Sequence, residues 1–182
     1  MAAAIPLPPQ FLAAEPLTAA AFRPFGDVIE ASAAATRRTI NEGYAERFHD
    51  LAHIDTAEQG GRTLVNIFRA VPCPLPLTLS LVERHLLSSQ AFVPLAPMRF
   101  LVVVAMAGPA PRLDQLRCFV AAPGQGVNYA RGTWHHPLLA LDAGGDFLVI
   151  DRGGPGAATD CEEHALVHVQ VQVQVQVQVT LS

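Results

Sequence analysis

The sequence predicts a mainly β fold in which short antiparallel strands form a single sandwich or barrel. Apolar segments of strand length recur along the chain between proline and glycine turns, and no long amphipathic helix pattern accompanies them. With 182 residues, 51% of them hydrophobic and 15% charged, the chain can bury one core and is too apolar to be disordered.

The N-terminal part is expected to contain the helix of this fold. Residues 1–16 are an Ala/Pro-rich lead that we expect to be flexible. Residues 17–22 (LTAAAF) suit a short helix capped by Thr18, because a threonine hydroxyl can accept a hydrogen bond from the first helical turn. Residues 25–30 then form a strand, and residues 31–39 form a loop of small residues.

The remainder of the domain is predicted to consist of strands. Each predicted strand is an apolar run that ends at Pro, Gly or Ser. These runs are 62–70, 76–87, 90–95, 100–106, 116–122, 126–132, 134–141 and 146–154.

The C-terminal end alternates valine and glutamine strictly, a pattern typical of a strand with one buried face. From Val167 to Val179 it would extend roughly 40 Å at about 3.3 Å per residue, which is longer than strands normally run. We therefore predict a single domain over residues 17–168 and a tail over 169–182 that is a strand or disordered, with no assigned function.

Composition limits the partners. A net charge of −4 and a pI near 5.9 argue against nucleic-acid binding and against an anionic membrane surface. The longest apolar run, FLVVVAMAG, is too short to cross a bilayer. All 12 basic residues are arginines, which bind carboxylates through paired hydrogen bonds, so a small anionic substrate is possible.

The cysteines and the N-terminus indicate the compartment. Cys73, Cys118 and Cys161 are odd in number and far apart, as expected of reduced thiols in the cytoplasm. The first residues lack the basic region of a signal peptide and are interrupted by prolines. A cytoplasmic location is therefore expected.

A predicted hairpin carries three polar side chains among apolar ones. Glu83 and His85 are two residues apart, so they project from the same face of a strand, and Gln90 begins the next strand. Placing a carboxylate and an imidazole on an apolar face costs free energy unless they are paired or bind a metal. A buried His–Glu hydrogen bond and a metal site are both compatible with this pattern.

Two adjacent histidines, His135 and His136, follow a glycine turn and the lone tryptophan, Trp134. Neighbouring side chains of a strand point to opposite faces, so only one of the two histidines can enter the cavity.

These two segments resemble the paired metal motifs of the cupins. The pattern E83-x-H85-x4-Q90 is similar to the first motif, with Glu for a histidine and Gln for a glutamate. The run from Gly124 to His135 is similar to the second, with Ala130 in place of proline. The resemblance selects His135 as the inward residue and implies a cupin-like (RmlC-like) antiparallel β-barrel or jelly roll.

Five successive blocks resemble the ureidoglycolate lyase family, over about residues 17–161. They are INEGYAERFHDLA, RTLVNIFRA, LVERHLLSSQAFVPL, GQGVNYARGTWHHPL and FLVIDRGG. The resemblance implies a cytoplasmic enzyme, usually a homodimer, that cleaves (S)-ureidoglycolate to glyoxylate and urea in allantoin breakdown. It also implies a divalent metal, with nickel attributed to the family.

Roles for individual residues follow from this chemistry. Imidazole, carboxylate and amide groups suit a divalent metal, and arginines suit the substrate carboxylate. The candidate metal ligands are His85, His135, Glu83 and Gln90. The candidate catalytic residues are Glu83, His136 and Arg69. The candidate substrate-binding residues are Arg69, Arg47, Asn41 and Gln90.

Several alternatives stay open. Glu83 is either a ligand or a general base, and His136 is either an acid–base group or a histidine hydrogen-bonded beneath Trp134. The block containing Asn41, Arg47, His49 and Asp50 is either a structured loop, for example at the dimer interface, or a substrate-binding lid. Trp134 is expected in the core or pocket wall, and Arg152 in a turn with a structural ion pair. The alternative functions are a hydrolase releasing ammonia and carbon dioxide, and a non-catalytic protein that binds a small acid.

Overall fold

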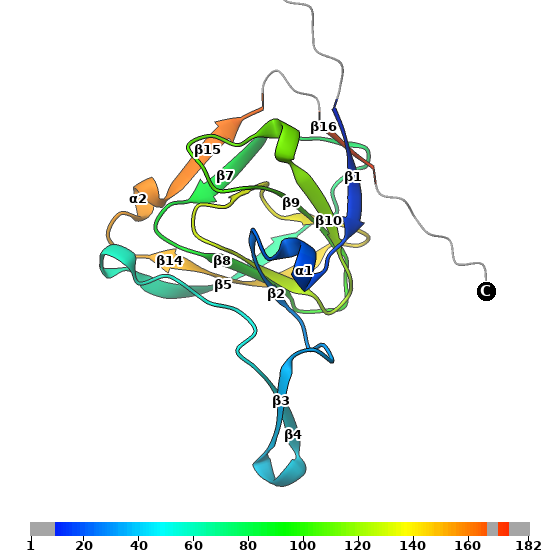
Figure 1. Cartoon of the computed structure of the whole chain (residues 1–182), viewed down its shortest axis with the longest axis vertical. Helices are drawn as coiled ribbons and strands as arrows, with labels where there is room; N and C mark the ends of the chain where they lie inside the picture. The colour runs from blue at the N-terminus through cyan, green and yellow to red at the C-terminus, as the bar shows by residue number, and fades with distance from the viewer. Residues whose placement is uncertain (1–9, 167–170, 175–182) are drawn as a thin grey trace, which may run out of the picture.

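The computed structural model describes residues 10–166 and 171–174, with side chains from residue 12 to residue 166 (Figure 1). It contains two large β-sheets and a separate two-stranded sheet. The nine-stranded sheet has the order β15 (Cys161–Ala165), β7 (Leu81–His85), β12 (Trp134–His135), β9 (Phe100–Ala105), β10 (Arg117–Ala121), β1 (Gln10–Pro16), β16 (Val171–Gln174) and β6 (Leu77–Thr78), with β13 (Leu139–Ala140) also paired to β9. The five-stranded sheet has the order β2 (Gly26–Ile29), β11 (Gly126–Tyr129), β8 (Gln90–Pro94), β14 (Gly145–Gly153) and β5 (Arg62–Ala70).

The predicted mainly β, antiparallel architecture is confirmed. Among the paired strands, only β1 runs parallel to its neighbours β10 and β16. The short N-terminal helix is also present as α1 (Ala19–Phe22), and the Thr18 hydroxyl accepts a hydrogen bond from the Ala21 amide as its N-cap. The remaining helical segments are α2 (Ala157–Asp160) and three 3-10 turns, Asn41–Gly43, Glu58–Gly60 and Leu113–Gln115.

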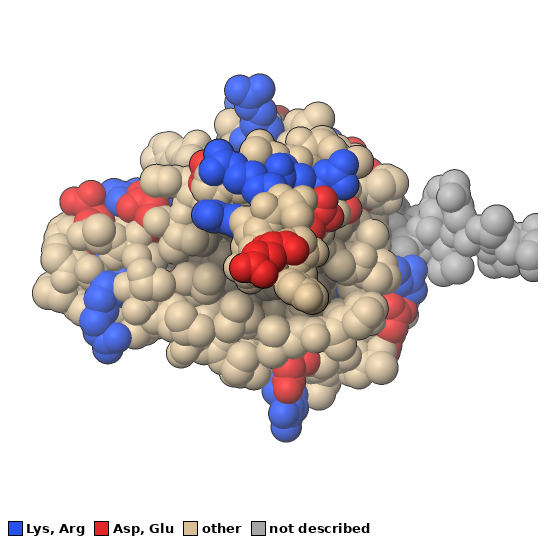
Figure 2. All heavy atoms as spheres, turned by 90° about the horizontal axis from the view of Figure 1, so that it is seen from below, with Lys and Arg blue, Asp and Glu red and all other residues tan. Residues whose placement is uncertain are grey.

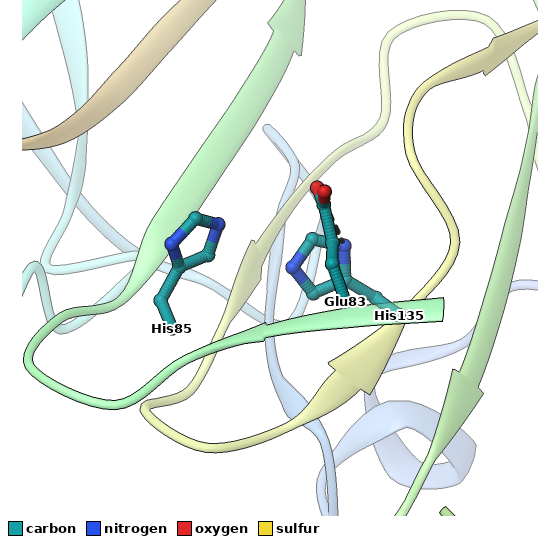
Figure 3. A group of neighbouring side chains, drawn as sticks. All are labelled: Glu83, His85 and His135. Carbon is teal, nitrogen blue, oxygen red and sulfur yellow. Dashed lines mark ion pairs between the residues drawn. The ribbon is translucent and has the colours of Figure 1, made fainter. Parts of the chain in front are cut away.

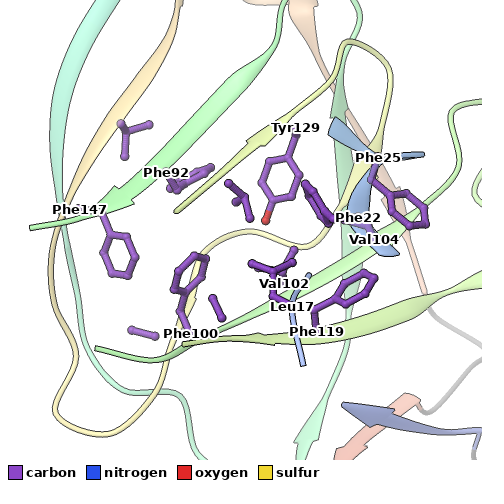
Figure 4. Packing of buried hydrophobic residues seen from close by; sticks show 14 of the residues in the cluster. Leu17, Phe22, Phe25, Phe92, Phe100, Val102, Val104, Phe119, Tyr129 and Phe147 are labelled. Carbon is purple, nitrogen blue, oxygen red and sulfur yellow. The ribbon is translucent and has the colours of Figure 1, made fainter. Parts of the chain in front are cut away.

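The main core lies between the two large sheets (Figure 4). Phe100 and Phe119 of the larger sheet and Phe92 and Phe147 of the smaller sheet belong to one buried cluster. The rings of Phe100 and Phe147 meet edge to face, with their centroids 5.3 Å apart. Contacts of this kind join the two sheets into a sandwich.

Strand β9 is buried on both faces. Phe100, Val102 and Val104 belong to the cluster between the sheets, while Leu101 and Val103 belong to a second cluster on the opposite side. This position explains why the segment is a continuous apolar run rather than an alternating one.

The predicted flexible lead is wrong for Gln10–Pro16, because this segment forms strand β1. Ala14 is in register with Cys118 of β10, and the following Leu17 amide donates to the Val120 carbonyl. The hydrogen-bonding partner lies about a hundred residues later in the chain, so the local Ala/Pro composition gave no indication of it. Residues 1–9 of the predicted lead lie outside the described residues.

The C-terminal repeat is described in part. Val171–Gln174 forms β16, in agreement with the strand alternative for this segment. The remainder of the predicted tail lies outside the described residues, and the limits predicted for the domain stay a prediction.

The predicted loop over 31–39 is wrong at its end. Thr36–Ile40 is strand β3, which pairs with β4 (Ala45–His49) in an antiparallel hairpin. The hairpin projects from the sandwich, as the lower part of Figure 1 shows. Cross-strand hydrogen bonds to β4 give this polar segment its extended conformation despite its lack of an apolar pattern.

No helix within the described ranges has both the length and the apolar character needed to cross a membrane.

Candidate active site

Three side chains that the sequence predicted as metal ligands converge on one point (Figure 3). Glu83 and His85 project from one face of β7, and His135 of β12 is directly opposite Glu83 across the strand pair. One nitrogen or oxygen atom from each of the three side chains lies within 4.8 Å of the others. The strand alternation and the β7–β12 register together produce this group.

Three buried polar atoms in and beside the group have no hydrogen-bond partner within the described residues. The Nε2 atoms of His85 and His135 and the Oε1 atom of Gln90 are buried and have no hydrogen-bond partner. Leaving buried polar atoms unpaired costs about 1–3 kcal/mol each, and a bound ligand that pairs with them would remove this cost. Two imidazole nitrogens, a carboxylate and an amide oxygen fit a divalent metal of the nickel, zinc or iron type.

Burial shifts the protonation equilibria of the site. Desolvation raises the pKa of Glu83. The nearby His85 and the Cys161 thiol, which donates a hydrogen bond to the Glu83 carboxylate, partly offset this rise. Desolvation, together with the neighbouring His85, lowers the pKa of His135 from its ordinary value of 6.5 to about 3. His135 is therefore neutral near pH 7, as a metal ligand must be.

Two further residues contact the histidines, and the sequence analysis missed both. Tyr129 of β11 stacks its ring on His135, with 4.1 Å between the centroids and 3° between the planes. Asp160 is buried, with its Oδ2 atom 3.9 Å from Nδ1 of His85. Asp160 also accepts hydrogen bonds from the Leu87 amide and the Ser88 hydroxyl, which hold its carboxylate beside the histidine.

His136 lies outside the group, in agreement with the strand alternation. Its amide donates to the Val103 carbonyl, and its Nδ1 is 2.8 Å from the Pro137 carbonyl oxygen. Burial lowers the pKa of His136 as well. The neighbouring Trp134 is buried in the second core cluster, as predicted, and its indole N–H donates to the Gly108 carbonyl.

A cavity of about 500 Å³ opens beside the group. Glu83, Gln90, Phe68 and Phe92 are among the residues that line it. Arg69 is also at its rim, but its guanidinium makes two hydrogen bonds to the Asp146 carboxylate, at 2.7 and 2.9 Å. A substrate carboxylate would have to compete with Asp146 for this arginine.

The other predicted substrate-binding residues lie on the β3–β4 hairpin. Asn41 is at its tip and Arg47 is on β4, and both are exposed. His49 and Asp50 follow at the base of the hairpin. Within a single chain the structure does not bring Asn41 or Arg47 to the group formed by Glu83, His85 and His135.

The prediction for Arg152 needs a correction. Arg152 is structural, but it is a buried residue of β14 rather than a turn residue. Its guanidinium donates to the carbonyl oxygens of Glu58 and Pro155 instead of forming an ion pair with a carboxylate. It thereby fixes two neighbouring loops against the end of β14.

Comparison with known proteins shows the family. The family model described as ureidoglycolate lyase matches residues 9–174. The chain is also 56% identical over 145 residues to the ureidoglycolate lyase of Burkholderia mallei (strain NCTC 10229), covering 80% of this chain and 84% of that protein. It belongs to the ureidoglycolate lyase family.

More distant relatives in this family extend the match. The ureidoglycolate lyase of Azotobacter vinelandii (strain DJ / ATCC BAA-1303) is 50% identical over 155 residues, which cover 85% of this chain and 92% of that protein. The ureidoglycolate lyase of Pseudomonas syringae pv. syringae (strain B728a) is 49% identical over 156 residues, covering 86% of this chain and 90% of that protein. The similarity to the ureidoglycolate lyase family therefore includes both the sandwich and the hairpin.

Proposed function

We propose that this protein is a metal-dependent lyase that cleaves (S)-ureidoglycolate to glyoxylate and urea in allantoin breakdown. The observation that carries the proposal is the convergence of Glu83, His85 and His135 beside a cavity, in a chain of the ureidoglycolate lyase family. The reaction breaks the bond between the carbinol carbon and a urea nitrogen, so it needs a group that removes the hydroxyl proton and a proton for the departing nitrogen.

The resident metal in this proposal is Ni²⁺. His85, His135, Gln90 and one oxygen of Glu83 would hold it, since the buried Nε2 and Oε1 atoms of this set have no other partner. When bound, a divalent metal acidifies a substrate hydroxyl and neutralises the developing negative charge.

The residues of the chain move the proton. Glu83 lines the cavity, so the carboxylate oxygen that does not hold the metal is placed to act as the general base. It accepts the hydroxyl proton as the carbonyl of glyoxylate forms and the C–N bond breaks. The same proton then goes to the urea nitrogen, so the reaction consumes no water and releases neutral urea. Gln90 lines the same cavity from β8 of the five-stranded sheet, which does not pair with β7, and it orients the substrate from that side.

A cytoplasmic homodimer completes the proposal. Three free cysteines, Cys73, Cys118 and Cys161, fit a reducing compartment.

A product assay with and without a chelator tests the function. Purified protein with (S)-ureidoglycolate should give glyoxylate and urea in equal amounts without ammonia, and the chelator should abolish both products until Ni²⁺ is restored. His135→Ala should lose metal and activity, because it removes a buried ligand. His53→Ala is the matched control, since the side chain of His53 is exposed.

Two results would contradict the proposal. Ammonia in place of urea would identify a hydrolase instead. Metal-loaded protein that releases no glyoxylate would identify a ligand-binding protein.

A further inference from the structure

The β3–β4 hairpin, residues 36–49, has the features of an arm that binds another molecule. Its strands hydrogen-bond only to each other within the described residues, so the hairpin stands apart from both large sheets. An isolated two-stranded hairpin is marginally stable in water and normally needs a surface to pack on. Its tip carries two large exposed side chains, Tyr44 at 91% and Ile40 at 38% of full exposure.

One face of the arm concentrates unpaired positive charge. Arg38 and Arg47 are directly opposite each other across the two strands, where like charges repel. Neither has a carboxylate partner among the described residues, whereas Arg37 on the other face has an ion pair with Glu46. Basic side chains form a row across the surface when the molecule is viewed from the hairpin side (Figure 2). Such a face fits an anion that the chain itself does not supply.

The arginine at the cavity beside Glu83 is already paired with a carboxylate. The reaction proposed above has a carboxylate substrate, and this inference rests on that proposal. Arg69 is the arginine at the cavity rim, and Asp146 already neutralises it through two hydrogen bonds. Among the described residues that line this cavity, no guanidinium is therefore free to bind a substrate carboxylate.

The edge of the smaller sheet next to this cavity is apolar and uncovered. Strand β5 is an edge strand of its sheet, and Val65 and Ile67 on it are 67% and 55% exposed. Val71, which lines the cavity just beyond β5, is 81% exposed. A free sheet edge with exposed apolar side chains is a surface that proteins normally cover.

We propose that the arm of one copy of this chain packs on the β5 edge of a second copy and places Arg38 and Arg47 at the mouth of the second copy's cavity, where they bind the substrate carboxylate. The apolar tip matches the apolar edge, and the unpaired arginines match the carboxylate. Strands of five residues extend the arm by about 17 Å at 3.3 Å per residue, and a two-fold axis makes the exchange reciprocal. Each site is then built from both chains.

A heterodimer made of two differently impaired variants tests this arrangement. Arg38→Ala/Arg47→Ala retains the metal group but has a neutral arm, and we expect its KM to rise about 10- to 100-fold. His135→Ala retains the arm but lacks the metal group. Co-expression with two different tags isolates the mixed dimer, in which one of the two sites pairs an intact metal group with an intact arm. Measured below KM, the mixed dimer should recover about half of the wild-type kcat/KM.

The oligomeric mass gives a readout that does not depend on activity. The wild-type chain should have the mass of a dimer, and Tyr44→Asp at the tip should shift it towards the monomer while its circular dichroism spectrum is unchanged. Arg112→Ala is the matched control for the arginine variants, because Arg112 is exposed and pairs with the nearby Asp114.

Three outcomes would overturn the proposal. These are a monomeric wild-type protein, a mixed dimer no more active than its two parents, and an arm variant with an unchanged KM. If the wild-type dimer has no lyase activity, the proposed function fails, and the effect of Tyr44→Asp on mass still decides whether the arm binds a second copy.

Discussion

Acidification of the chelator-treated protein should destabilise its fold through His135. This side chain is 1% exposed, and burial lowers its pKa from 6.5 to about 3. Between these two values the unfolded chain binds a proton at this position and the folded chain does not. The free energy of unfolding therefore falls as the pH falls, by about 1.4 kcal/mol for each pH unit below 6.5. At pH 5 the expected loss from His135 is about 2 kcal/mol relative to pH 7.

Urea unfolding at several pH values measures this effect. The free energy of unfolding of the wild-type protein and of His135→Gln should be compared at pH 7 and at pH 5, both in the presence of chelator. The glutamine does not titrate, so the variant should lose about 2 kcal/mol less than the wild type over this interval. His136 also has a lowered pKa, but it is present in both proteins and its contribution cancels. Equal losses in the two proteins would refute the argument that His135 is buried in its neutral form.

Two substitutions examine the surroundings of the site and the core. Asp160→Asn removes the carboxylate beside His85 and should weaken metal affinity about 10- to 100-fold in a competition titration. Asp114→Asn is the control, because Asp114 is exposed. Equal affinities of the wild type and Asp160→Asn would show that Asp160 does not orient the histidine. Phe22→Ala removes a fully buried side chain and should lower the free energy of unfolding by about 3–5 kcal/mol. Leu95→Ala, at a position that is 55% exposed, should lower it by less than about 1 kcal/mol.

The strand pattern and the group of three ligands could be predicted because both depend on short-range alternation. Glu83 and His85 share a face simply because they are two residues apart on β7. The same alternation separates His135 from His136, and the structure groups His135 with the other two side chains.

Other features depend on pairings between distant segments, which local patterns do not reveal. Asp160 reaches His85 because β15, which begins at the next residue, pairs with β7. Nothing in the sequence around Asp160 indicates that partner. Tyr129 was on a predicted strand, but its stacking on His135 depends on how the two sheets pack against each other.

The polar composition of the hairpin was also uninformative about its conformation. Strand prediction relies on buried apolar residues, and every residue of β3 is exposed. A segment that packs on a second molecule can be extended without any pattern that a single chain would require.

The pairing of the first strands with strands about a hundred residues later has a consequence for synthesis on the ribosome. β1 pairs with β10, and β2 pairs with β11, so neither has a large-sheet neighbour near it in sequence. The nascent chain must therefore expose Phe22 and Phe25 until residue 129 or later has left the exit tunnel. During that time this apolar segment is available to chaperones or to other nascent chains, and truncated products should aggregate rather than fold.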